Sequence, residues 1–246
     1  MNTLLKLFVI LLFVTVAGCS GAKLKSDKPA DVIYKEAMDF FERKDYEEAI
    51  AAFQELDAKY PVSEYTVQAK LRIADSYYKD ENYPEAISAF REFEKLHPIN
   101  ENVPYAVFQT GMAYFSQMLT IDRDQTPTMN AAAEFERLLS RFPGSKYTDE
   151  AKRNLRTARN NLSENEFYVA SFYFKKGNYK AAMERFDAVR SKYPEFAAMD
   201  KVLFYAAKAY IKIDEKDKGK ALLEKLSSDY PLSSYTNKAK KILGDN

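Results

Sequence analysis

The sequence predicts an all-α fold, a right-handed solenoid of five helix hairpins, from its composition and from an internal repeat. The 246 residues are 46% apolar and 30% charged, enough to bury a sizeable core. Seven glycines are too few for the frequent tight turns of a β-sandwich or barrel. Basic and acidic residues number 37 and 36, so the positive field of a nucleic-acid-binding protein is missing and no nucleic-acid partner is expected.

The repeat combines a small residue, an aromatic four positions later, and a proline eight positions after that. Its copies are Ala49, Phe53, Pro61; Ala86, Phe90, Pro98; Ala131, Phe135, Pro143; Ala182, Phe186, Pro194; and a weaker Gly219, Leu223, Pro231. Before each copy lies a small residue with an aromatic three positions later: Ala37 and Phe40, Ala74 and Tyr77, Gly111 and Tyr114, Ala170 and Tyr173, Ala207 and Tyr210. This is the tetratricopeptide spacing, in which small residues let two antiparallel helices approach and the proline ends the second.

Two intervals between copies are longer than the others, and each indicates an added element. Between Tyr114 and Ala131 the extra residues, 118–129, include several charges and Pro127, which favours an enlarged loop. After Pro143, the apolar residues Ala151, Leu155, Ala158 and Leu162 follow at helical spacing. We therefore expect repeats one to three in residues 31–147, and a long connecting helix with repeats four and five in residues 148–246.

The first eighteen residues are typical of a secretory signal peptide. Lys6 precedes an apolar run from Leu7 to Val14, which is too short to span a bilayer as a helix. The motif Val16-Ala17-Gly18-Cys19 resembles a bacterial lipobox, which predicts lipidation of Cys19 and membrane attachment through the lipid. An ordinary cleavage site with a stray cysteine is the alternative. Residues 19–30, rich in lysine, are expected to tether the solenoid.

Residues able to support chemistry are scarce. Cys19 is the only cysteine and His97 the only histidine, which leaves no usual set of zinc ligands. His97 stands before Pro98, where the other repeats carry Tyr or Phe, so a packing role is expected. A glycine-rich phosphate loop is also missing. The sequence therefore predicts no catalytic residues, no metal and no cofactor, and a protein that acts by binding.

Ten residues of the first three repeats are predicted to face the concave side of the solenoid, and we call this set the inner wall. The repeat register selects nine of them, one residue after each small or aromatic marker of the first helix and three before the small one, and Lys79 is added because it lies beside Tyr78. The set is Tyr34, Met38, Phe41, Leu71, Asp75, Tyr78, Lys79, Phe108, Met112 and Phe115. Such a surface suits a peptide with apolar anchors, and Lys79 suits a terminal carboxylate. Packing between repeats is the alternative reading for each residue.

The lipobox, the five repeats, the Tyr-Pro-x-Ser-x-Tyr-Thr cassettes at 60–66 and 230–236, the insertion with Asp122 and Asp124, and the long helix together resemble the BamD family of outer-membrane protein assembly lipoproteins. The resemblance implies a non-enzymatic subunit of the β-barrel assembly machine, anchored by lipid on the periplasmic face of the outer membrane. It also implies docking of the C-terminal repeats on a BamA-like barrel subunit beside other assembly-machine lipoproteins. The N-terminal repeats would receive unfolded outer-membrane protein precursors.

The same resemblance carries over one residue that faces the barrel subunit, Arg185, next to the repeat marker Phe186. A solvated helix-surface charge is the alternative. For the whole protein, two other functions are open. One is a periplasmic repeat adaptor that coordinates cell-envelope or Tol-linked processes, although the early start of the repeats leaves no room for its N-terminal coiled coil. The other is a repeat-bearing lipoprotein enzyme or cell-wall hydrolase, for which no catalytic constellation is visible.

Overall fold

The computed structural model describes residues 28–244, and every regular element in this range is an α-helix. The helices are α2 (Ala30–Glu42), α3 (Tyr46–Lys59), α4 (Glu64–Lys79), α5 (Tyr83–Leu96), α6 (Val103–Ser116), α7 (Thr126–Arg141), α8 (Thr148–Lys175), α9 (Tyr179–Lys192), α10 (Met199–Lys212), α11 (Lys216–Asp229) and α12 (Ser234–Gly244). The predicted signal peptide, Cys19 and most of the tether lie outside the described residues.

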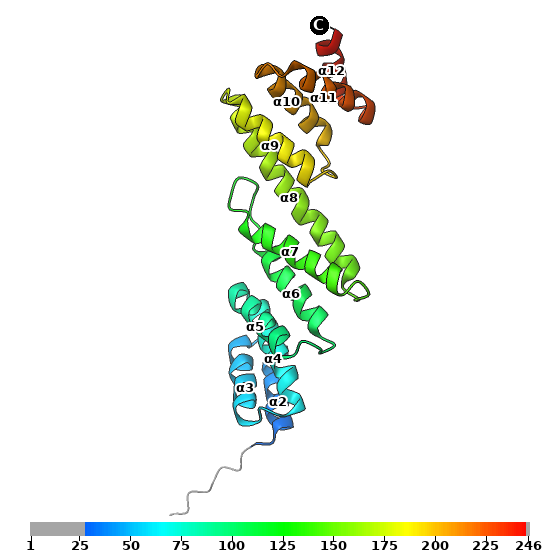
Figure 1. Ribbon diagram of the computed structural model, residues 1–246. Helices are drawn as coiled ribbons and strands as arrows, with labels where there is room; N and C mark the ends of the chain where they lie inside the picture. The colour runs from blue at the N-terminus through cyan, green and yellow to red at the C-terminus, as the bar shows by residue number, and fades with distance from the viewer. Residues whose placement is uncertain (1–27, 245–246) are drawn as a thin grey trace, which may run out of the picture.

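Consecutive helices pack as five hairpins stacked into an elongated solenoid (Figure 1). The pairs are α2–α3, α4–α5, α6–α7, the second half of α8 with α9, and α10–α11; α12 packs on α11 at the far end. The prediction of an all-α solenoid of five hairpins is therefore confirmed.

Small residues lie where the two helices of each hairpin meet, as the repeat predicts. Ala37 and Ala49 in the first hairpin, and Ala170 and Ala182 in the fourth, are fully buried. In the fifth hairpin, a Cβ added at Gly219 would lie 2.9 Å from the backbone oxygen of Ala207. Because α11 approaches the α10 backbone this closely, the weakest copy of the repeat still obeys its packing rule.

The turns between the helices of four hairpins share one backbone conformation. Lys44, Glu81, Gly177 and Asp214 have φ values of 67°, 59°, 79° and 66°, in the left-handed region. One such residue reverses the chain after the first helix of each hairpin. The third hairpin instead has the loop 117–125. The enlarged loop is present, but its expected extent of 118–129 is wrong at the end, because residues 126–129, with Pro127, form the first turn of α7.

That loop is attached to α8 by side chains of the long helix. Asn165 donates from Nδ2 to the carbonyl of Ile121 at 2.6 Å, and Asn161 donates to the carbonyl of Leu119 at 3.5 Å. At the end of the loop, Asp124 accepts from the backbone N–H of Thr126 at 3.0 Å and so supports the start of α7. The insertion is thereby held against the second half of the solenoid.

α8 is a single helix of 28 residues that passes from the first three repeats to the last two (Figure 1). Its first part, up to Leu162, belongs to the core formed by α4–α7, and its last part, from Ala170, belongs to the core formed by α9–α12. A third core joins α2, α3 and the start of α4. The division between the two large cores thus falls inside α8, because its first part covers the apolar side of α7.

Serines of the repeated cassettes accept backbone hydrogen bonds at the turns. Ser63 and Ser233 directly precede α4 and α12 and accept from the N–H groups two residues later, at 3.3 and 3.1 Å. Ser145 makes the equivalent bond to Tyr147, but α8 begins only at Thr148. The similar cassette at 142–148 predicts that Ser145 also N-caps its helix. This prediction is wrong, because Tyr147 is the N-cap residue of α8.

Substitution of Gly219 by alanine tests the close approach of α10 and α11. The new Cβ would meet Ile211 Cγ1 at 2.6 Å as well as the Ala207 carbonyl, which cannot move independently of its helix. We expect Gly219→Ala to lower the free energy of unfolding by about 1–2 kcal/mol, since overpacking outweighs the better helix propensity of alanine. Urea unfolding measures this.

Gly144→Ala is the matched control, because nothing lies within 4 Å of a Cβ at this exposed turn. We expect its free energy of unfolding to stay within about 0.5 kcal/mol of the parent. Equal stability of the Gly219→Ala variant and the parent would contradict the packing argument.

Candidate functional site

The inner wall begins in the first repeat with three partly exposed side chains on α2. The Tyr34 ring lies 5.7 Å from that of Phe53 and 5.4 Å from that of Tyr65, between centroids. Met38 and Phe41 pack against the same core. These side chains support their own repeat with one face and leave the other face to solvent.

The second repeat supplies both buried and exposed members of the wall. Leu71 and Asp75 on α4 are 8% and 5% exposed, so neighbouring helices cover them. Tyr78 is half-buried, with its hydroxyl 3.4 Å from Ser116 Oγ of α6. Lys79, at the end of α4, is exposed and has no ion-pair partner among residues 28–244.

In the third repeat, α6 turns its wall residues toward α7 and α8. Phe108 is 6% exposed and stacks on Tyr147, with ring centroids 5.0 Å apart. Met112 Sδ accepts from Asn154 Nδ2 of α8 at 3.1 Å, and the edge of Phe115 meets Phe135 at 6.1 Å. Leu71, Asp75 and Phe108 are thus covered within the monomer, while the other seven wall residues retain accessible surface. Contact with a ligand stays a prediction for all ten.

Asp75 links two repeats through a buried hydrogen-bond network. It accepts from Arg72 Nη1 at 2.9 Å and from the hydroxyl of Tyr105 on α6 at 2.6 Å, and that hydroxyl accepts from Gln109 at 2.9 Å. Burial raises the pKa of Asp75 above its ordinary value, although Tyr105 and Arg72 oppose the shift. Burial, and then the charge of Asp75, raise the pKa of Tyr105. Asp75 therefore acts as a structural link between α4 and α6.

Arg185 projects from α9 of the fourth hairpin. It is exposed, and its Nη1 donates to Glu166 Oε2 of α8 at 2.9 Å. Exposed ion pairs of this kind contribute little to stability, so the guanidinium remains accessible to a second carboxylate. The structure does not bring Arg185 into contact with the inner wall.

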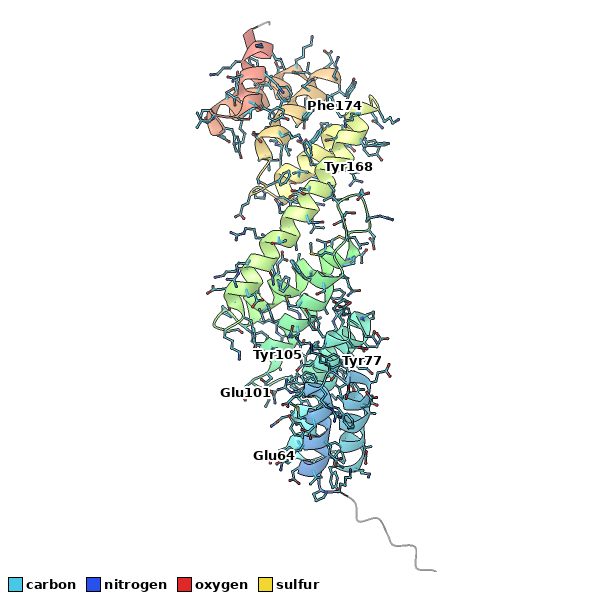
Figure 2. All side chains as sticks on the ribbon, turned by 180° about the vertical axis from the view of Figure 1, so that it is seen from behind. Glu64, Tyr77, Glu101, Tyr105, Tyr168 and Phe174 are labelled. Carbon is cyan, nitrogen blue, oxygen red and sulfur yellow. The ribbon has the colours of Figure 1, made fainter. Side chains whose placement is uncertain are left out.

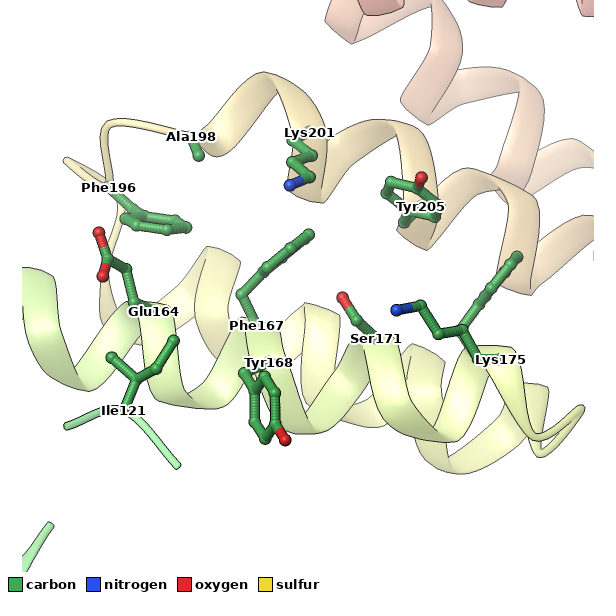
Figure 3. A pocket seen from close by; sticks show the side chains of 11 residues that line it. Ile121, Glu164, Phe167, Tyr168, Ser171, Lys175, Phe196, Ala198, Lys201 and Tyr205 are labelled. Carbon is green, nitrogen blue, oxygen red and sulfur yellow. The ribbon is translucent and has the colours of Figure 1, made fainter. Parts of the chain in front are cut away.

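A groove lies in the C-terminal repeats, and we call it the α8–α10 groove (Figure 3). It has a volume of about 450 Å³. Its lining comes from α8, from the turn before α10, from α10 and from the loop 117–125. The residues are Ile121, Glu164, Phe167, Tyr168, Ser171, Phe174, Lys175, Phe196, Ala198, Lys201 and Tyr205.

The groove and the inner wall occupy different parts of the rod (Figure 2). Tyr77 and Tyr105 mark the level of repeats two and three, whereas Tyr168 and Phe174 lie near the C-terminal end. The register rule that selected the inner wall, when extended to the fourth repeat, selects Phe167, Ser171 and Phe174. The signal for the groove was therefore present in the sequence, but the rule was applied only to the first three repeats.

Comparison with known proteins identifies the family. A family model described as "Outer membrane lipoprotein", YfiO, matches residues 26–222. The chain belongs to this family. Members of the family with similar sequences include two proteins named "Outer membrane protein assembly factor BamD". The one from Caulobacter vibrioides is 27% identical, covering 96% of this chain and 79% of the relative, and the one from Rickettsia prowazekii is 27% identical, covering 96% and 94%.

Solved structures of other helical-repeat proteins are also similar to this family member. The TPR2AB domain of yeast Sti1 is 14% identical, with a TM-score of 0.43 over 88% of this chain and 84% of that one. The TPR domain of P58(IPK) is 15% identical, with a TM-score of 0.45 over 88% and 66%. Within residues 28–244, no helix is both long and apolar enough to cross a membrane.

The pKa of Asp75 predicts a pH dependence that Asp75→Asn removes. A carboxyl whose folded pKa is raised stabilises the fold below its unfolded pKa of about 3.9, and this contribution is lost as the pH rises through the folded value. We therefore expect the unfolding free energy of the parent, minus that of Asp75→Asn, to fall as the pH rises from about 3.5 to 7.

Urea unfolding of both proteins at several pH values measures this difference, in which contributions from all other groups cancel. Asp39→Asn, at an exposed position of α2, is the matched control for the substitution itself. A parent that gains stability relative to Asp75→Asn as the pH rises would contradict the assigned direction.

Proposed function

We propose that the protein is a non-enzymatic lipoprotein subunit of the β-barrel assembly machine, attached by lipid to the periplasmic face of the outer membrane. One observation carries this proposal: the family match, over residues 26–222, to outer-membrane lipoproteins whose relatives are named assembly factors. The helical-hairpin solenoid supports it, because stacked hairpins present extended concave surfaces suited to polypeptide ligands.

We assign the binding of unfolded outer-membrane protein precursors to the N-terminal repeats. The support is the inner wall, where seven residues, mostly aromatic or methionine, keep accessible surface. Lys79 stands exposed at its edge, suitable for a carboxylate. Aromatic and methionine side chains adapt to many apolar sequences, which suits a subunit that handles different precursors.

Docking on a BamA-like barrel subunit, beside other assembly-machine lipoproteins, is assigned to repeats four and five. Arg185 supports this assignment, because its guanidinium is exposed and its ion pair with Glu166 fixes its direction. A carboxylate of the partner would join or replace Glu166 in that pair.

Purification from a Gram-negative host tests the assembly role. We expect the tagged full-length protein to recover a barrel-assembly subunit from solubilised membranes. Recovery of only Tol-linked or cell-wall proteins would instead favour the envelope adaptor.

Reversing the charge at Arg185 tests whether this residue binds the partner or only stabilises the fold. We expect Arg185→Glu to reduce recovery of the barrel subunit about tenfold, since a desolvated charge pair becomes a repulsion. The double variant Arg185→Glu, Glu166→Arg restores an ion pair within the monomer but places the positive charge on α8. Low recovery with both variants supports docking, whereas full recovery with the double variant would assign Arg185 a structural role only.

Cys19→Ala tests the lipid anchor, which lies outside the described residues. Without acyl chains, the protein loses the burial of many methylenes at about 0.8 kcal/mol each, so it should move to the soluble periplasmic fraction. Ser20→Ala, which keeps the thiol, is the control and should remain with the membrane. Retention of Cys19→Ala on membranes stripped of partner proteins at high salt would contradict the anchor.

A further inference from the structure

The α8–α10 groove combines an apolar floor with two lysine side chains, one in its middle and one at its end (Figure 3). Phe167, Phe174, Phe196 and Tyr205 form much of the lining, and the ring of Tyr168 is 49% exposed at the rim. Aromatic side chains exposed in a concave site are typical of recognition surfaces, because each ring offers a large contact area.

Two lysines extend into this aromatic groove from opposite helices. The Lys201 ammonium lies over the Phe167 ring, 4.9 Å from its centroid, and Lys175 stands at the end of α8 (Figure 3). Neither has an ion-pair partner among residues 28–244, although both stand beside helices rich in charge. The cation–π contact directs the Lys201 ammonium into the groove rather than away from it.

The acidic charge of the groove lies at the other end. Glu164 accepts from Asn160 at 3.1 Å and stands near Phe196 and Ile121, away from Lys175 (Figure 3). The groove thus has one carboxylate against two ammonium groups, and the charges are separated along its length. A ligand that complements this surface carries apolar rings for the aromatic lining and carboxylates beside them for the two lysines.

We propose that the α8–α10 groove binds a peptide segment of another protein in which aromatic side chains stand next to aspartate or glutamate. An aromatic ring packs in the groove beside Phe167 and Tyr205, whose own rings touch each other, and neighbouring carboxylates meet Lys201 in the middle of the groove and Lys175 at its end. The loop 117–125 contributes to this site, since Asn165 holds the Ile121 carbonyl and thereby places Ile121 at the acidic end. The third repeat therefore shapes a site that belongs mainly to the fourth and fifth.

A short dye-labelled peptide with two phenylalanines, each next to an aspartate, tests the proposal by fluorescence anisotropy. Its C-terminus is amidated, so only side-chain carboxylates are available. With the purified soluble chain lacking residues 1–18 and carrying Cys19→Ala, we expect saturable binding that weakens as salt rises. A peptide with serines in place of the aspartates should bind about tenfold more weakly.

Charge variants locate the binding site. We expect Lys201→Glu to weaken binding of the aspartate peptide about tenfold, whereas Lys240→Glu, at an exposed position of α12 outside the groove, should stay within about twofold. Equal weakening by both variants would show that the peptide is attracted only by the overall charge of the protein, and it would overturn the proposal.

A steric variant tests the groove independently of charge. Ser171→Trp places an indole in the cavity and should abolish binding, while Ser191→Trp, on the exposed surface of α9, should not. Thermal unfolding followed by circular dichroism verifies that both variants fold. Unchanged binding to Ser171→Trp would overturn the proposal.

Light scattering distinguishes a second copy of the chain from a peptide partner. A concentration-dependent dimer that is lost in Ser171→Trp, without any peptide binding, would assign the groove to self-association. Because the peptide measurement needs no assembly machine, it fails or succeeds independently of the purification experiment.

Discussion

Close approach of paired helices at small side chains is the constraint on which the rest of the structure depends. Ala37 and Ala49, or Ala170 and Ala182, are fully buried where the paired helices meet, and their small side chains let the two backbones approach closely. The aromatic side chain four residues later, such as Phe53 or Phe186, then fills the space beside the contact. Each hairpin is thereby fixed in angle, and the next one stacks in the same way. The concave surfaces follow from this geometry.

The sequence predicted much of the fold because the packing rule repeats. Five copies of one pattern are easier to detect than any single helix. Even in the fifth copy, where Leu223 replaces the aromatic residue, Gly219 lies at a close contact between the two helices. The prediction for Ser145 was wrong because a similar cassette stands before a helix that begins two residues later. Local similarity of sequence did not determine where that helix starts.

The candidate site was harder to predict, because exposure depends on neighbouring repeats. Leu71 and Phe108 occupy the same register as the partly exposed Tyr34, but they are covered by adjacent helices. The register gives the direction of a side chain and not the distance to the next helix. Asp75 shows the same limit, since its partner Tyr105 lies thirty residues away on another repeat. The groove in repeats four and five required the positions of α10 and the loop together.

Because α8 is one continuous helix, it fixes the orientation of one end of the rod relative to the other. An α-helix advances by about 1.5 Å and rotates by roughly 100° for each residue. The 28 residues of α8 therefore set both the separation and the relative azimuth of the inner wall and the groove. A one-residue insertion in the middle of α8 would rotate the α8–α10 groove by roughly a quarter turn about the helix axis, relative to the inner wall. The number of residues in α8 therefore determines the rotation of the groove relative to the inner wall.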